Sequence, residues 1–213
     1  MILDKPIARV VVKCLVLLSA GFSGIISRSN LPLSISLFVL SVAFQAVDYL
    51  ISHRITTLVL ERIAGVLEGA YNSCGFPADA DVRATIFVAS QSRADTLRQV
   101  GKYYPTNRYS SFRRGISSSK GIIGFCFRSG RRYLEVVEHQ ASFKSHLVEN
   151  WGFTKQEADV VKVRRSYLAI PIFDALGRTL GVAYFDSMKK NAFTPDVIDT
   201  LTRACVPLSK WVG

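Results

Sequence analysis

The sequence predicts an α+β fold in which an antiparallel sheet is flanked by helices and preceded by two transmembrane helices. Three observations predict it: two long apolar runs near the start, an amphipathic stretch after them, and short β-rich runs separated by turns in the remainder. At 213 residues the chain has room for one domain of about 150 residues and an appendage. We therefore expect a transmembrane hairpin over 1–52, a connecting helix over 53–75 and a cytosolic domain over 76–213.

Two apolar runs, Ile7–Ser27 and Leu31–Ile51, dominate the N-terminal segment. Each has about 21 residues, which as a helix crosses a hydrocarbon layer of roughly 30 Å. The break at 28–30 leaves room only for a tight turn, and the many small residues of both runs would let the helices pack closely or oligomerise. A cleaved signal peptide is less favoured because no A-x-A site follows, and a buried hairpin of a soluble protein is the other alternative. We expect a two-helix antiparallel hairpin.

Basic residues flank the predicted hairpin on the side of the two chain ends. They are Lys5, Arg9 and Lys13 before the first helix, and His53, Arg54 and Arg62 after the second. The turn between the helices offers only Arg28. The positive-inside rule then places both termini and the C-terminal domain in the cytoplasm, with the hairpin in contact with membrane lipid. We expect a bacterial inner (plasma) membrane protein.

The rest of the chain alternates between helical and extended patterns. After a helix over 53–72, which Cys74 to Pro77 ends, strands are expected over 82–89, 97–103 and 132–137, a short helix over 121–128, and mostly helical structure over 142–163. Thr154 and Glu157 have the spacing of a capping box. The connecting helix would either transmit a change to the membrane helices or simply pack on the sheet, and the two roles are compatible.

The last part of the domain has the clearest pattern. Two apolar β-rich runs, 166–173 and 179–186, are separated by a five-residue break that contains Gly177, as in a β-hairpin. Thr194, Pro195 and Asp196 then have the residue types that begin a helix: a hydroxyl N-cap, a proline and an acid. We expect two adjacent antiparallel strands followed by a capped helix.

Two segments resemble the motifs of the GAF domain family. Within Arg165–Leu201, the succession SYLAIP, DALGR, LGVAYFDS and NAFTPD resembles the C-terminal half of a GAF domain. Over Lys120–Glu138, the segment KGIIGFCFRSGRRYLEVVE resembles the middle motif of the family. The likeness covers roughly residues 55 to 212. It implies a GAF-like sheet with helices on both faces, and a small-ligand sensor as the usual role. GAF domains bind many ligands, and some bind none, so the likeness says little about which ligand is bound.

Positive charge is concentrated in one segment. Between Arg93 and Arg132 the chain has ten basic residues against Asp95 alone, a net charge of +9 in a chain whose total is +11. In a GAF-like fold this segment borders the ligand cavity, so it favours a small anionic ligand such as a cyclic or linear nucleotide. Two alternatives remain: the basic face lies on anionic headgroups, or it is solvated without a partner. Nucleic acid is not expected, because no recognition motif is present.

Seven residues are the candidates for ligand binding. The expected phosphate contacts are Arg113, Arg114, Lys120 and Arg128, and the expected apolar or stacking contacts are Phe112, Phe125 and Tyr167. These residues combine the planar, charged and aromatic groups with which a nucleotide is usually held. We expect them around one cavity.

Catalytic and metal chemistry have little support in the sequence. The cysteines Cys14, Cys74, Cys126 and Cys205 are far apart, without a CxxC pair or Cys/His ligand spacing. His139 and His146 lie near Glu138 and Glu149, but no nucleophile with a matched base can be identified.

One class of GAF-fold enzymes, the free methionine sulfoxide reductases, resembles the chain in fold but not in its cysteines. Those enzymes use cysteines in the middle motif and before the hairpin. This chain has Ile123 in the first place and no cysteine between Ala141 and Tyr167, so Cys126 is expected to pack as a small apolar residue. We expect no catalytic residue, cofactor or metal, and a protein that is not an enzyme.

Three functions fit these expectations. The first is a membrane-anchored sensor, a homo-oligomer that signals through its hairpin or a partner, because few residues follow the last expected helix. The second is an antiviral membrane effector, in which a nucleotide drives oligomerisation and membrane disruption. The third is a dimerisation scaffold that binds no ligand.

Overall fold

The computed structural model of the chain describes residues 31–90, 95–105 and 115–212. The chain divides into two compact units, and the boundary between them lies after Val59. The first predicted membrane span, 7–27, lies outside the described residues, as do the candidate site residues Phe112, Arg113 and Arg114.

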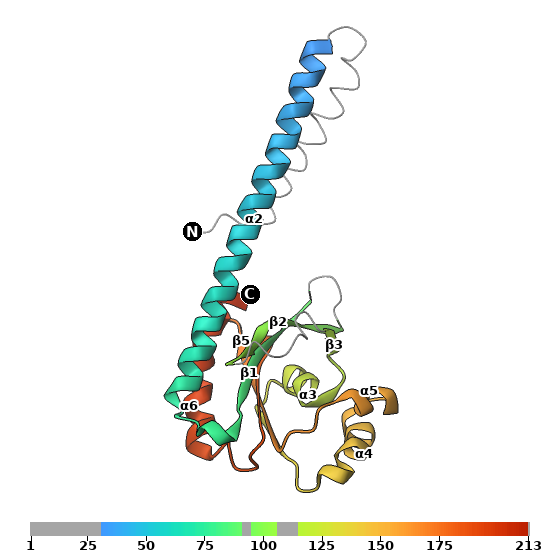
Figure 1. Ribbon diagram of the computed structural model, residues 1–213, viewed down its shortest axis with the longest axis vertical. Coiled ribbons are helices and arrows are strands. Elements are labelled where there is room, and N and C mark those ends of the chain that lie inside the picture. The colour runs from blue at the N-terminus through green and yellow to red at the C-terminus, as the bar shows by residue number, and fades with distance from the viewer. Residues whose placement is uncertain (1–30, 91–94, 106–114, 213) are drawn as a thin grey trace. The chain divides into compact units, whose positions relative to one another are not determined.

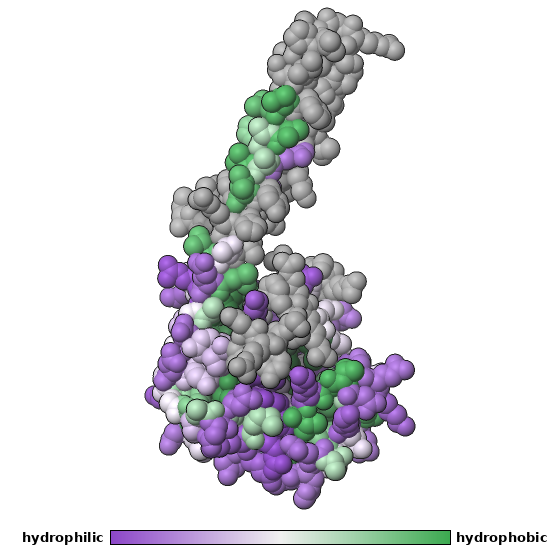
Figure 2. Space-filling model, in the orientation of Figure 1, coloured by the Kyte–Doolittle hydropathy of each residue, from purple (hydrophilic) through white to green (hydrophobic). Residues whose placement is uncertain are grey.

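A single uninterrupted helix, α2 (Leu31–Ser73), includes the second predicted span and the predicted connecting helix. Exposed apolar side chains cluster along its residues 39–50, where Figure 2 shows them in green. These side chains are Val39, Leu40, Val42, Phe44, Val47 and Leu50. Among the described residues, no helix is both long enough and apolar enough to cross a membrane. The membrane hairpin therefore stays a prediction.

The second unit is built on an antiparallel sheet of six strands in the order β3-β2-β1-β6-β5-β4. The strands are β1 (Arg83–Ala89), β2 (Thr96–Tyr104), β3 (Gly115–Ser117), β4 (Tyr133–Val136), β5 (Ser166–Phe173) and β6 (Thr179–Ser187). Every pairing between neighbouring strands is antiparallel. The predicted antiparallel α+β architecture is confirmed.

The predicted hairpin forms β5 and β6, which lie side by side between β1 and β4. Asp174 closes its turn by accepting hydrogen bonds at Oδ1 from the backbone N–H groups of Leu176 (2.9 Å) and Arg178 (2.8 Å). An aspartate side chain that bonds to the backbone two residues ahead is a common turn device. In the helix that follows, the Thr194 hydroxyl accepts from the Val197 N–H and Pro195 is the first residue, as expected.

Helices cover both faces of the sheet (Figure 1). One face carries the last turns of α2 and α6 (Pro195–Cys205), and the other carries α3 (Gly121–Ser129), α4 (Gln140–Trp151) and α5 (Lys155–Val160). Three short turns of helix complete the chain: η1 (Ala78–Ala80), η2 (Val206–Leu208) and α7 (Ser209–Val212). The capping box predicted at Thr154 and Glu157 begins α5.

The C-terminal turns of α2 are held to the domain by an apolar stripe. Ile63, Leu67 and Ala70 are spaced four and three residues apart and are each no more than 2% exposed. Burial of an isoleucine or leucine side chain contributes roughly 2 kcal/mol. The part of the predicted connecting helix from residue 60 onward thus packs on the domain, which is one of the two roles predicted for it.

Candidate functional site

An apolar cavity of about 80 Å³ lies between the sheet and the helices α3 and α4. Tyr167 and Tyr184 contribute from β5 and β6, Ile122 and Ile123 from α3, and Phe143, Leu147 and Trp151 from α4. Gly121, Phe153, Val161, Ile116 and Glu135 complete the lining. A concave, mostly apolar site with few polar groups is the usual form of a small-molecule site. The cavity is therefore the candidate functional site.

Two glycines place α3 at the wall of the cavity. Gly121 begins the helix at a φ of +66°, a value that favours glycine. A Cβ on Gly124 would stand 2.5 Å from the Ser118 carbonyl oxygen, so only glycine lets the helix approach that backbone so closely. The glycine pattern of the middle motif thus has a structural cause: α3 lies so close to the loop before it that a side chain at Gly124 would clash.

Stacked aromatic rings form the floor of the cavity. The ring of Tyr167 lies 5.3 Å from that of Phe143 and almost parallel to it, at 9°. Tyr184 stands 6.4 Å from Tyr167 and meets Phe87 edge to face at 6.1 Å. Burial raises the pKa of Tyr167 and that of Tyr184 well above the ordinary value of 10.0. Both hydroxyls therefore stay protonated at physiological pH and remain able to donate a hydrogen bond.

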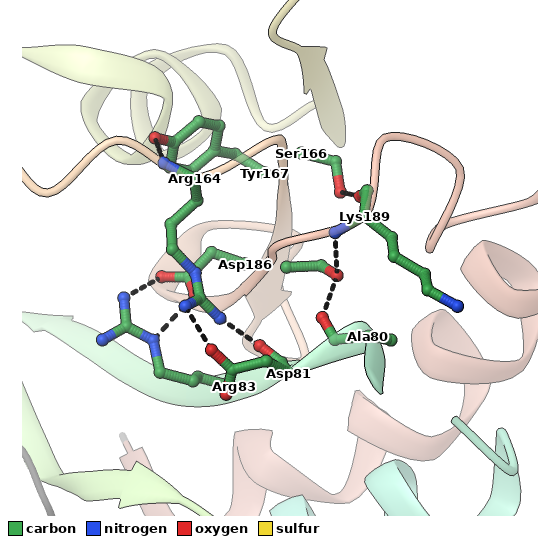
Figure 3. A network of polar contacts seen from close by, with 9 residues as sticks. Ala80, Asp81, Arg83, Arg164, Ser166, Tyr167, Asp186 and Lys189 are labelled. Carbon is green, nitrogen blue, oxygen red and sulfur yellow. Dashed lines mark hydrogen bonds and ion pairs between the residues drawn. The ribbon is translucent and has the colours of Figure 1, made fainter. Parts of the chain in front are cut away.

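The floor rests on a buried network of charged groups (Figure 3). The Arg83 guanidinium donates to both carboxylate oxygens of Asp186, at 2.8 and 2.6 Å. Nε of Arg164 lies 2.9 Å from Asp186 Oδ1, an ion-pair contact that is not aligned as a hydrogen bond. Arg164 Nη1 donates to Asp81 Oδ2 at 2.6 Å, and its backbone N–H donates to the Tyr167 hydroxyl at 2.7 Å. The network thereby ties Tyr167 to β1 and β6.

Burial and charge pairing act in opposite directions on this network. Burial by itself acts to lower the pKa of Arg83, but the hydrogen bonds and charge of Asp186 outweigh it, so the pKa lies above its ordinary value. Asp186 is 1% exposed, and the two arginines are 7% and 5% exposed. The Arg83 guanidinium therefore remains charged inside the protein.

A second polar cluster borders the cavity at β4 and α4. Glu135 Oε1 lies 3.1 Å from Nε2 of His146, and the indole N–H of Trp151 donates to the same Nε2 at 2.9 Å. The other ring nitrogen, Nδ1, lies 3.0 Å from the side-chain nitrogen of Asn150. Burial, together with the charge of Glu135 and the hydrogen bond to it, raises the pKa of Tyr133. Glu135 and Trp151 are the members of this cluster that reach the cavity.

The structure gives the predicted site residues different surroundings. Tyr167 lines the cavity as expected. Phe125 is 38% exposed and packs edge to face against Tyr133 and Trp151. Arg128 donates to the Ser118 carbonyl, and Lys120 donates to both carboxylate oxygens of Glu157. Lys120 and Arg128 are thus bonded within the protein.

The Lys120–Glu157 pair makes stability depend on pH. The hydrogen bond from Lys120, with those at Thr154, lowers the pKa of Glu157 from 4.5 to about 2. Because the folded pKa lies below the unfolded one, the stabilisation is present above about pH 4.5 and is lost as the pH falls toward 2. We expect Glu157→Gln to lower the melting temperature by about 2 to 4 °C at pH 7, since a partly exposed pair, here with side chains 26% and 42% exposed, contributes about 1 kcal/mol.

Circular dichroism melts at pH 7, 5, 4 and 3 would measure this effect. The difference between Glu157→Gln and the unmodified chain should shrink below pH 4.5, whereas Glu149→Gln, on the exposed side of α4, should cause no such change. A difference that stays constant down to pH 3 would contradict the assignment.

The thiols of the described chain are poor nucleophiles. Cys126 is fully buried in the core beside the cavity, as expected of a small apolar residue, and burial raises its pKa to about 12. Burial also raises the pKa of Cys205 to about 12. Within residues 31–90, 95–105 and 115–212, no three His, Cys, Asp or Glu side chains are grouped so as to hold a metal ion. The cavity is therefore suited to binding through ring faces, hydroxyls and one carboxylate.

Several cavity residues were not predicted from the sequence. Glu135 lies in a strand of only four residues, and Phe143, Trp151 and Phe153 read as ordinary core positions. From the sequence, the expected acidic neighbour of His146 is Glu149, one turn along the helix. In the structure the acidic neighbour of His146 is Glu135 on β4. One signal was available in the sequence: Glu135 follows Tyr133 by two residues in an expected strand, so the two side chains lie on the same face of the sheet.

Solved structures of very different sequence have the same fold. A type II free methionine-R-sulfoxide reductase from Thermoplasma acidophilum matches with a TM-score of 0.52 and 12% identity over 74% of this chain and 94% of that protein. The GAF domain of a two-component sensor histidine kinase from Bacillus halodurans matches with a TM-score of 0.51 and 14% identity over 70% and 92%. A segment of a methyl-accepting chemotaxis protein matches with a TM-score of 0.53 and 16% identity over 74% and 94%.

No family model and no curated protein matches the chain. At these identities the structural matches establish the fold alone, and their proteins include both sensors and an enzyme. The predicted resemblance is thereby confirmed for the fold: residues 60–213 form a GAF-like domain, an antiparallel six-stranded sheet with flanking helices.

Proposed function

We propose that the protein is a sensor whose GAF-like domain binds a small ligand in the cavity between α3, α4 and the sheet. The observation that carries this proposal is the cavity itself, which combines an aromatic lining with hydroxyl and carboxylate groups at its edges. Binding is favoured over catalysis because the thiols of Cys126 and Cys205 are buried and their pKa values are raised.

We propose further that the N-terminal segment anchors the sensor in a membrane. The two apolar runs of the sequence support this, together with the exposed apolar side chains of α2 between Val39 and Leu50. One uninterrupted helix joins that segment to the buried residues Ile63 and Leu67. A change of packing inside the domain would therefore act on the last turns of the helix that also includes the second apolar run.

The size of the cavity favours a ligand smaller than a nucleotide. Sites for drug-sized ligands usually have about 300 to 1,000 Å³, against about 80 Å³ here. Lys120 and Arg128, two of the four predicted phosphate ligands, are bonded within the protein. The basic segment Arg93–Arg132 keeps an anionic ligand, including a nucleotide, as the competing candidate.

Thermal shift of the full chain in mild detergent, with a panel of small cations, anions, neutral molecules and cyclic and linear nucleotides, tests the proposal. A ligand that binds only the folded state raises the free energy of unfolding, by about 2.7 kcal/mol at a concentration of 100 times its Kd, and the melting temperature rises with it. We expect Ile122→Phe, which fills the cavity, to abolish the shift, and Val160→Phe, at a 70% exposed position of α5, to preserve it.

Two outcomes would contradict a ligand-binding sensor. A panel without any stabilising member would favour the scaffold, and a shift that persists in Ile122→Phe would place the ligand elsewhere. Expression in cells supplied with the stabilising ligand then separates a sensor from a membrane effector, because only an effector should depolarise the membrane.

A further inference from the structure

The cavity has an acidic character that the basic sequence around it does not suggest. Glu135 is the one charged side chain among the described residues that line it, and its side chain is 16% exposed. An anion in the cavity would therefore meet a carboxylate in a poorly solvated place, where like charges repel strongly. The lining favours a ligand that is neutral or positively charged.

The ion pairs of the described residues give Glu135 no lysine or arginine partner; its neighbours are His146 and the Tyr133 hydroxyl. The Trp151 indole N–H donates to His146 Nε2, and a nitrogen that accepts this bond carries no proton with which to bond Glu135. Among the described residues, Glu135 therefore has no lysine or arginine beside it, and a bound cation would balance its charge.

Aromatic rings surround the same space. Five lining residues are aromatic: Phe143, Trp151, Phe153, Tyr167 and Tyr184. The negative face of an aromatic ring attracts a cation within about 6 Å, and cages of several rings are a common way to hold ammonium groups. Such rings also make apolar contacts with the carbon atoms attached to the nitrogen. A hydrated metal ion has no carbon atoms and would gain no such contacts.

The volume limits the ligand to a few atoms. Apolar cavities of about 150 Å³ hold one benzene molecule, so about 80 Å³ suits a group of roughly three or four non-hydrogen atoms. We propose that the cavity takes a small organic cation, an alkylated ammonium whose charge is balanced by Glu135 and whose carbon groups contact the aromatic rings. This proposal rests on the proposed function, namely that the cavity is a ligand site.

Three probes of similar size and different charge test the assignment: trimethylammonium, isopropanol and acetate. Trp151 and Trp211 are the two tryptophans of the chain, so Trp211→Phe leaves Trp151, which lines the cavity, as the indole whose fluorescence responds. In the full chain with this substitution, we expect trimethylammonium to bind at least tenfold more tightly than isopropanol, and acetate to give no change.

Glu135→Gln, which keeps the size and removes the charge, should weaken trimethylammonium binding tenfold or more while leaving isopropanol binding unchanged. Glu149→Gln, at an exposed position of α4, is the matched control and should leave both unchanged. Melting curves of each variant establish that it is folded at the temperature of the titration.

The other outcomes overturn the cation assignment in distinguishable ways. Equal binding of isopropanol and trimethylammonium, or unchanged binding in Glu135→Gln, would leave the cavity as a ligand site without a preference for cations. Preference for acetate would overturn it in favour of the anionic ligand. No response to any probe would also overturn it, and the thermal-shift panel with Ile122→Phe then decides the proposed function separately.

Discussion

Asparagine in place of Asp186 is expected to lower the free energy of unfolding by about 3 to 5 kcal/mol. The substitution leaves two buried guanidinium groups, those of Arg83 and Arg164, without the carboxylate they share. A buried charge that has lost a partner keeps most of its cost of desolvation, and at exposures of 7% and 5% water offsets little of it. Arg164 keeps Asp81 as a partner, so the larger part of the loss is expected at Arg83. Urea unfolding of the full chain, followed by tryptophan fluorescence, measures the loss.

The matched control is Asp199→Asn, because Asp199 also pairs with an arginine, Arg132, at 2.6 Å, but both side chains are more than half exposed. We expect this control to cost no more than about 1 kcal/mol. A similar small cost for Asp186→Asn would show that Arg83 and Arg164 reach solvent in the folded protein. Because Arg164 also bonds Tyr167, the same variant should weaken ligand binding in the cavity.

Local chemistry explains why the end of the chain could be predicted from the sequence. The turn at Asp174, the capping box at Thr154 and the cap at Thr194 each depend on residues within four positions of one another. Signals of this range are visible in any sequence. The strand β3 (Gly115–Ser117) could not be predicted, since three residues are too few to show a period.

Long-range contacts explain why the candidate site was only partly predicted. Arg83 and Asp186 are separated by 103 residues, and no local pattern relates them. Composition suggested a phosphate site from Lys120 and Arg128, but the fold bonds both to nearby oxygen atoms. Charge density along a sequence thus indicates a basic surface without telling which cations remain available to a ligand.

The aromatic half of the site illustrates the same limit. Tyr167 was predicted, because it begins the strand of a strong hairpin motif. Trp151 and Phe143 belong to a helix whose apolar positions are what any core requires, so nothing distinguishes cavity lining from core packing until α4 is placed against the sheet. The same holds for Glu135, whose role depends on β4 being the strand that α4 faces.

Alanine in place of Gly124 is expected to destabilise the domain by about 2 to 3 kcal/mol. The sign is informative, since glycine to alanine inside a helix ordinarily stabilises by up to about 1 kcal/mol. Here the new methyl group would stand 2.5 Å from the carbonyl oxygen and 2.9 Å from the carbonyl carbon of Ser118, and these are backbone atoms that cannot rotate away. Either α3 or the loop at Ser118 must move.

The displacement of α3 should also reach the cavity, because Ile122 and Ile123 belong to the same turn of helix and line its wall. We therefore expect Gly124→Ala to weaken ligand binding at temperatures where the variant is still folded. Gly69→Ala is the matched control: its Cβ would meet nothing within 4 Å, so the change should be neutral or slightly stabilising. Urea unfolding of the two variants decides the matter. Stabilisation by both would mean that α3 has room to shift, and that the approach of Gly124 to Ser118 does not fix the shape of the site.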